Sequence, residues 1–184
     1  MNTQYTQEQF DKDVAFFNTA CGKTIPTTQE EFDREVSQQQ RLVQEESTET
    51  MIALIENDPV GILDGLVDTL FTTSWLVHLI TSCTDKGFCI SQMLGVWLDC
   101  IPINQVGALF DESVVLEAMH RVALNNASKF TADRHRAEIW AASATEYVLS
   151  EVVVDDVVYF CLRDQNGKVR KHFEYTPVYL GDLI

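Results

Sequence analysis

The chain has 184 residues, of which 46% are hydrophobic, so it is long enough to bury the core of one domain. Its 13 Lys and Arg against 28 Asp and Glu give a formal net charge of −15, which argues against a nucleic-acid polymer as partner. Five irregularly spaced cysteines with no preceding signal peptide favour a cytoplasmic protein over a disulfide framework. We expect one domain over residues 1–184.

The first two predicted helices lie in the first 56 residues. Apolar side chains recur at helical spacing within residues 5–19, and Gly22 lies in the break that follows. A second helix is expected from Thr28 to about Glu56. Thr28 stands three positions before Glu31, a spacing typical of a capped helix start.

A third helix is predicted from Pro59 to about Ser82, because Asp58 can cap it and proline suits a first helical turn. Its sequence is apolar and long enough to cross a bilayer, but it contains Asp64 and Asp68. An aspartate at the centre of a span costs about 2.5–3.5 kcal/mol on insertion scales. We therefore expect no membrane span.

The remaining elements change character toward the C-terminus. Residues 84–88 are expected to form a loop, followed by an apolar segment at 90–98 and a helix from Asn104 to about Asn125. Valine-rich and aromatic runs around Asn166-Gly167 predict a β-hairpin. The predicted fold class is all-α, with a four-helix bundle core, extra helices and a small C-terminal β-hairpin. The helical core is expected at about residues 5–149, and the hairpin and tail at about 150–184.

Five carboxylates fall on the second and third predicted helices. Glu45, Glu46 and Glu49 are spaced three and four apart, so they share one arc of the second helix. Asp64 and Asp68 are four apart and project together from the third. A short connection makes the two helices antiparallel neighbours, so the two acidic sets can face each other.

Buried carboxylates that lie together need a positive partner, and no Lys or Arg occurs between Arg41 and Ile80. A hard divalent cation is the natural partner, and Mg²⁺ also binds phosphate, with Mn²⁺ as an alternative. Two other interpretations stay open. The glutamates can form a solvated helix face, and the aspartates a helix-start pair or a polar seam in an oligomer.

Two motifs carry a family resemblance. Residues 45–49 (EESTE) followed by 64–68 (DGLVD) resemble the metal motif of the MazG-like all-α nucleoside triphosphate pyrophosphohydrolases. That superfamily includes phosphoribosyl-ATP pyrophosphohydrolase and the dimeric dUTPases. The blocks 16–18 (FFN), 125–129 (NNASK), 167–171 (GKVRK) and 175–177 (YTP) are similar to those of its phage and bacterial branch.

The resemblance implies roles for individual residues. It implies metal ligation by Glu46, Glu49, Asp64 and Asp68, and catalysis by the glutamates, with Glu45 orienting water. This sequence departs from the family at Gly65, where many members carry the earlier acid, so Asp64 is expected to reach the metal either directly or through water. Substrate binding is implied for five residues of the matching blocks: Asn125, Lys129, Lys168, Lys171 and Tyr175. Simple solvation is the alternative for each lysine.

The implied activity is hydrolysis of a ribo- or deoxyribonucleoside triphosphate to the monophosphate and pyrophosphate. The resemblance favours dGTP, dCTP or dUTP, in a bacterial or phage-infected cytoplasm, and a homodimer or homotetramer. A hydrolase of a signalling nucleotide such as ppGpp is an alternative. The competing class is a non-catalytic helical oligomer that binds a nucleotide or a partner.

Overall fold

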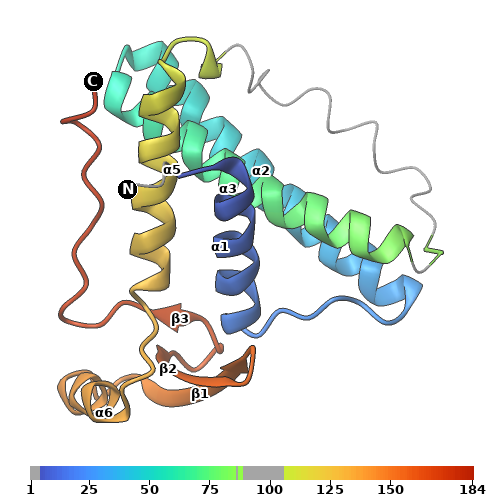
Figure 1. Cartoon of the computed structure of the whole chain (residues 1–184), viewed down its shortest axis with the longest axis vertical. Coiled ribbons are helices and arrows are strands. Elements are labelled where there is room, and N and C mark those ends of the chain that lie inside the picture. The colour runs from blue at the N-terminus through green and yellow to red at the C-terminus, as the bar shows by residue number, and fades with distance from the viewer. Residues whose placement is uncertain (1–4, 86, 89–105) are drawn as a thin grey trace.

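The structure, a computed structural model, describes residues 5–85, 87–88 and 106–184 (Figure 1). The described part contains five helices: α1 (Gln7–Ala20), α2 (Gln29–Glu56), α3 (Pro59–Thr84), α5 (Glu112–Ala127) and α6 (Arg134–Ser143). It also contains three strands, β1 (Val148–Val154), β2 (Val157–Arg163) and β3 (Val169–Arg170), which form an antiparallel sheet in the order β1-β2-β3. The predicted mostly helical class with a small C-terminal β element is confirmed.

Local capping signals fix the ends of α2 and α3. The Thr28 hydroxyl accepts a hydrogen bond from the Glu31 backbone N–H at 3.2 Å, as predicted. The Glu31 carboxylate reaches back one residue further than a capping box requires, and accepts from the Thr27 N–H and hydroxyl at 2.9 Å each. Asp58 caps α3 by accepting from the Val60 N–H at 3.1 Å. The predicted helix–turn–helix at this point is confirmed.

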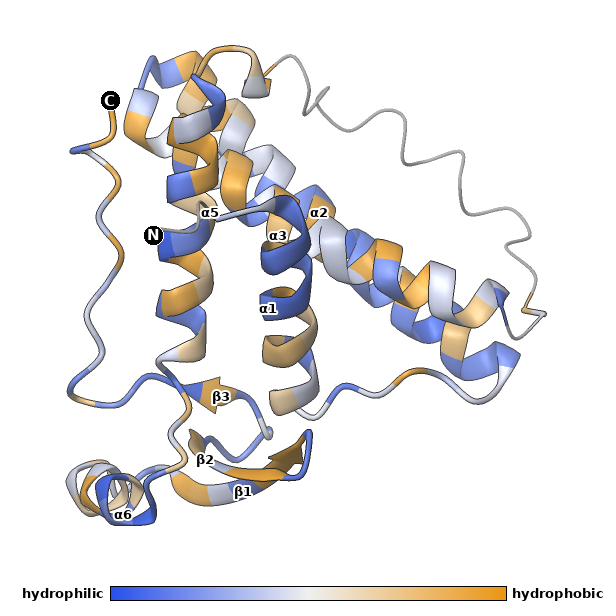
Figure 2. Ribbon diagram, in the orientation of Figure 1, coloured by the Kyte–Doolittle hydropathy of each residue, from blue (hydrophilic) through white to orange (hydrophobic). Residues whose placement is uncertain are grey.

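The core forms where α1, α3 and α5 meet. Leu63 and Val67 of α3 are fully buried in one cluster with Phe10 of α1 and Met119 of α5. Helix α2 lies antiparallel along another side of α3, and Figure 2 shows apolar residues distributed along both helices. Among the described helices, α3 is long and apolar enough to cross a bilayer, but half of its most apolar window is buried inside the molecule.

Helix α5 begins later than predicted. Its first residue is Glu112, with Asp111 in the extended N-cap conformation. The predicted continuous helix from Asn104 is therefore wrong, because residues 108–111 are not helical. Leu109, which falls within the predicted range, lies in a turn and is 60% exposed. Asn104 itself and the predicted apolar segment 90–98 lie outside the described residues.

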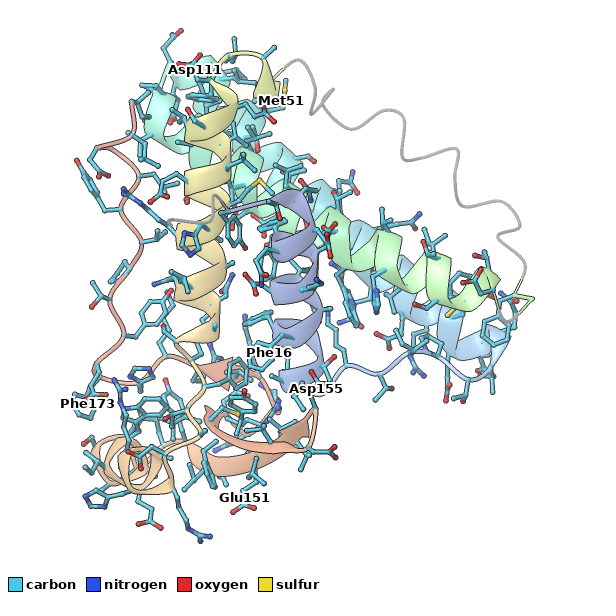
Figure 3. The ribbon with its side chains drawn as sticks, in the orientation of Figure 1. Phe16, Met51, Asp111, Glu151, Asp155 and Phe173 are labelled. Carbon is cyan, nitrogen blue, oxygen red and sulfur yellow. The ribbon has the colours of Figure 1, made fainter. Side chains whose placement is uncertain are left out.

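The sheet has two turns, of which the sequence predicted the second. Strands β1 and β2 are joined through Asp155 and Asp156, both with positive φ (49° and 63°), and Figure 3 labels Asp155 at this turn. Aspartate tolerates the left-handed region better than most residues, so this pair can replace the usual Asn-Gly. The predicted hairpin around Asn166-Gly167 is present as the antiparallel pair of β2 with the two-residue strand β3.

The sheet packs under one end of the helical core. The Phe16 ring of α1 meets the Tyr159 ring of β2 edge-on, with centroids 5.1 Å apart. The Arg163 guanidinium of β2 donates to the carbonyl oxygens of Ala20 and Cys21, just where α1 ends. From the sheet, the tail at 171–184 returns along α5 to the opposite end of the molecule (Figure 1).

Candidate active site

A close contact between α2 and α3 brings the two acidic sets together. A Cβ on Gly65 would lie 2.5 Å from the Thr50 Oγ1 and 3.0 Å from the Thr50 Cα, so only glycine allows this approach. Thr50 lies on the same turn of α2 as Glu46 and Glu49. The contact also explains the departure at Gly65, because a carboxylate there would have no room, and the nearest position that can carry one outward is Asp64.

Electrostatic coupling shows that the five acids form one group, the acidic cluster (Glu45, Glu46, Glu49, Asp64 and Asp68). Partial burial, and then the charges of Glu49, Glu45 and Asp64, raise the pKa of Glu46 to about 7. Burial and then Asp64, Glu46 and Glu49 raise the pKa of Asp68 to about 7. The pKa of Asp64 is raised by burial and by Glu49.

No side chain of the described residues neutralises the acidic cluster. Its carboxylates make no ion pair and no side-chain hydrogen bond there, and the only cation that acts on the pKa of Asp68 is the more remote charge of Lys129. In the described part of the chain, no three Asp, Glu, His or Cys side chains already form a close metal-ligand group. The donors are nonetheless all hard carboxylate oxygens, half-buried at Glu46 and Asp68, and they fit a hard divalent cation.

Lys129 lies just beyond the end of α5, close enough to Asp68 for each charge to act on the pKa of the other. Its Nζ donates to the Asn126 Oδ1 at 2.7 Å and is 5.1 Å from the centre of the Phe17 ring. Burial lowers its pKa, the nearby charges of Lys171 and Lys168 lower it further, and Asp68 opposes this shift. The three lysines predicted to bind substrate therefore lie close together, and we call Lys129, Lys168 and Lys171 the lysine cluster.

Tyr175 links the lysine cluster to the aspartates. The Lys171 Nζ lies 4.6 Å from the centre of the Tyr175 ring, and the Lys129 Nζ 5.9 Å from it. The Tyr175 hydroxyl donates to the Asn125 Oδ1, and the Asn125 Nδ2 donates to the Thr176 carbonyl oxygen at 2.5 Å. Burial raises the pKa of Tyr175, and the charges of Asp68 and Asp64 add to this effect. The residues predicted from separate blocks thus share one region.

Sequence reasoning missed Lys23, which follows α1. Its Nζ donates to the Gln39 Oε1 at 2.9 Å and lies 5.9 Å from the centre of the Trp75 ring. Gln39 in turn donates from its Nε2 to the Thr72 carbonyl oxygen at 2.9 Å, one turn beyond Asp68 on α3. An isolated lysine in a loop carries no sequence pattern that would have predicted this placement.

A separate shallow pocket of about 460 Å³ lies between α5 and the C-terminal tail. Arg121, Asn125 and Tyr179 are among its lining residues, and none of the acidic cluster lines it. Asn125 therefore contributes to both the pocket and the Tyr175 contact.

The fold and the acidic cluster together define a mostly helical protein with facing carboxylates on an antiparallel helix pair. Residues 14–81, which carry all five carboxylates, match the family model of phosphoribosyl-ATP pyrophosphohydrolase. The match agrees with the resemblance of the sequence motifs to the MazG-like all-α nucleoside triphosphate pyrophosphohydrolase superfamily, and the matched family implies a nucleotide pyrophosphohydrolase in general. The match covers a little over a third of the chain. No curated protein and no solved structure matches the chain.

Proposed function

We propose that this protein is a metal-dependent pyrophosphohydrolase that converts a nucleoside triphosphate to the monophosphate and pyrophosphate. The observation that supports the proposal best is the acidic cluster, whose carboxylates repel one another and form no ion pair with a Lys or Arg of the described residues. A protein that had no use for a cation would gain stability by replacing at least one of these acids.

In this proposal, Glu46, Glu49, Asp64 and Asp68 hold Mg²⁺, or alternatively Mn²⁺. The bound metal would neutralise the phosphate chain and stabilise charge as it develops. A glutamate of residues 45–49 accepts a proton from the attacking water, and the exposed Glu45 is the one that this metal assignment leaves available. The water oxygen bonds to the α-phosphorus, the bond from that phosphorus to the bridging oxygen breaks, and pyrophosphate leaves.

The lysine cluster is the proposed contact for the phosphate chain. Lys171 and Lys168 are exposed, and Lys129 is half-buried with its Nζ held by Asn126. Ammonium groups beside the carboxylates would bind phosphate oxygens directly while the metal screens the acids from the same phosphates. Asn125 and Tyr175 hold this group together, so we assign them to the binding site as well.

The exposed apolar side chains at the end of α2 support assembly into a homodimer or homotetramer. Met51, Ile52 and Ile55 are 44%, 50% and 74% exposed on two successive turns. A group of this kind marks an interaction surface more often than isolated exposed leucines do. We further propose that the enzyme is cytoplasmic and that it adjusts the nucleotide pool.

The test is release of pyrophosphate from a panel of nucleotides with Mg²⁺ or Mn²⁺. The panel holds the ribonucleoside triphosphates, dGTP, dCTP and dUTP, phosphoribosyl-ATP from the name of the matched family, and ppGpp. A Glu49→Gln, Asp68→Asn double variant should lose turnover, while Glu56→Gln, which changes an exposed acid at the C-terminal end of α2 outside the acidic cluster, should keep it. If the wild type binds metal but leaves every nucleotide intact, the non-catalytic binding protein replaces the enzyme.

A further inference from the structure

The segment that carries Lys171 and Tyr175 is held against α6 by contacts of His172 and Glu174 with Trp140, which we call the clasp. His172 is 6% exposed and stacks on Trp140, with ring centroids 3.7 Å apart and an interplanar angle of 2°. Glu174, two residues on, accepts hydrogen bonds from the Trp140 Nε1 and the Arg136 Nε, each at 2.8 Å. Trp140 of α6 therefore contacts both His172 and Glu174 and holds the short turn between them.

His172 also ties the clasp to the end of α5. Its Nε2 lies 2.8 Å from the Ser128 carbonyl oxygen, and since a carbonyl only accepts, the Nε2 carries the proton. Its Nδ1 is buried with no hydrogen-bond partner among the described residues. Ser128 directly precedes Lys129, so the same imidazole connects the two stretches of chain that supply the lysine cluster.

We propose that His172 is a positioning residue that sets the lysine cluster against the acidic cluster and thereby determines phosphate affinity. Its neighbour Lys171 lies over the Tyr175 ring, and the Tyr175 N–H donates to the His172 carbonyl oxygen at 3.0 Å. Displacing the imidazole would release Lys171 and Tyr175 together from Lys129. The expected effect on the reaction rests on the proposed function, whereas the expected effect on anion binding can be tested without it.

The consequence differs from that of losing a metal ligand. The imidazole touches neither the carboxylates nor the position proposed for the water, so a misplaced lysine cluster should weaken binding and leave the chemical step nearly unchanged. A hydrogen bond from a charged group to phosphate stabilises by about 1.5–3 kcal/mol, which corresponds to a change in affinity of about tenfold or more.

The experiment compares His172→Ala with His172→Gln and with Phe173→Ala. The alanine variant should raise KM for the preferred nucleotide about tenfold or more with little change in kcat, and should weaken binding of inorganic tripolyphosphate, measured by calorimetry, by the same factor. Glutamine can still donate to the Ser128 carbonyl and should recover part of the affinity. Phe173, which is 61% exposed beside the clasp (Figure 3), is the control and should change neither quantity.

Circular dichroism and a thermal melt establish that each variant is folded. Unchanged KM and tripolyphosphate affinity in folded His172→Ala would overturn the positioning role, as would a fall in kcat at constant KM. If His172→Ala does not fold, KM and tripolyphosphate affinity are compared between His172→Gln and Phe173→Ala. Equal values of both quantities in the two variants would overturn the positioning role. Should the wild type hydrolyse no nucleotide, the proposed function fails, and tripolyphosphate affinity still decides the role of His172.

Discussion

Replacing Gly65 by alanine should force α2 and α3 apart at the acidic cluster. The new Cβ would lie 2.5 Å from the Thr50 Oγ1 and 3.0 Å from the Thr50 Cα. The hydroxyl can rotate away but the backbone cannot, so the helices must separate or bend. Overpacking of this kind costs about 1–3 kcal/mol, and the better helix propensity of alanine returns about 1 kcal/mol.

The net loss should therefore approach about 2 kcal/mol, which lowers Tm by about 4–8 °C in a domain of this size. Separation of the helices also moves Glu46 and Glu49 away from the aspartates, so Mg²⁺ affinity should fall in calorimetric titration. Gly107→Ala is the matched control, because a Cβ there meets no atom within 4 Å. If Gly65→Ala melts and binds Mg²⁺ like Gly107→Ala, the close contact does not organise the acids.

Three further predictions test the charges and the sheet. The pKa values of Glu46 and Asp68 are raised to about 7 from ordinary values of 4.5 and 3.8, so the folded protein holds extra protons between these limits and loses stability as pH rises through 7. In EDTA the free energy of unfolding should be larger at pH 5 than at pH 8 by on the order of 1 kcal/mol after solvent screening, which a thermal melt detects as a higher melting temperature at pH 5. Mg²⁺ should remove the difference. Equal melting temperatures in EDTA would contradict the coupling. Lys129→Gln should raise KM about tenfold in a pyrophosphate-release assay, while Lys12→Gln, an exposed surface change, should leave it unchanged. Asp156→Gly should stabilise by about 0.5–1 kcal/mol in urea unfolding, because glycine relieves the positive φ of 63°; destabilisation would show that the aspartate makes a needed contact.

Local chemistry explains why the sequence predicted the α2–α3 hairpin well. Thr28 and Asp58 cap helices through contacts within three residues, and such contacts are readable from the chain alone. The acids shared helix faces for the same reason. The sequence could not show that Thr50 and Gly65 would set the separation of the helices, because that contact depends on how the two helices pack.

The errors and omissions fall on long-range contacts. His172 meets a carbonyl 44 positions away and Glu174 meets Trp140 34 positions away, so neither partner has a local signature. The main turn of the sheet was missed for another reason. Asn166-Gly167 is the stronger hairpin signal, but β3 ends after two residues and leaves β1 and β2 as the main pair.

The placement of the few lysines reconciles a net charge of −15 with the proposed anionic substrate. At physiological ionic strength, charges more than about 8 Å apart are largely screened, so a bound phosphate responds to its neighbours more than to the whole surface. Lys129 comes from the end of α5, and Lys168 and Lys171 from the segment after β2, yet the charges of Lys171 and Lys168 lower the pKa of Lys129. A local cationic region beside a carboxylate set that binds metal would therefore hold a triphosphate at both ends, whereas either region alone would hold only one part of the metal–nucleotide pair.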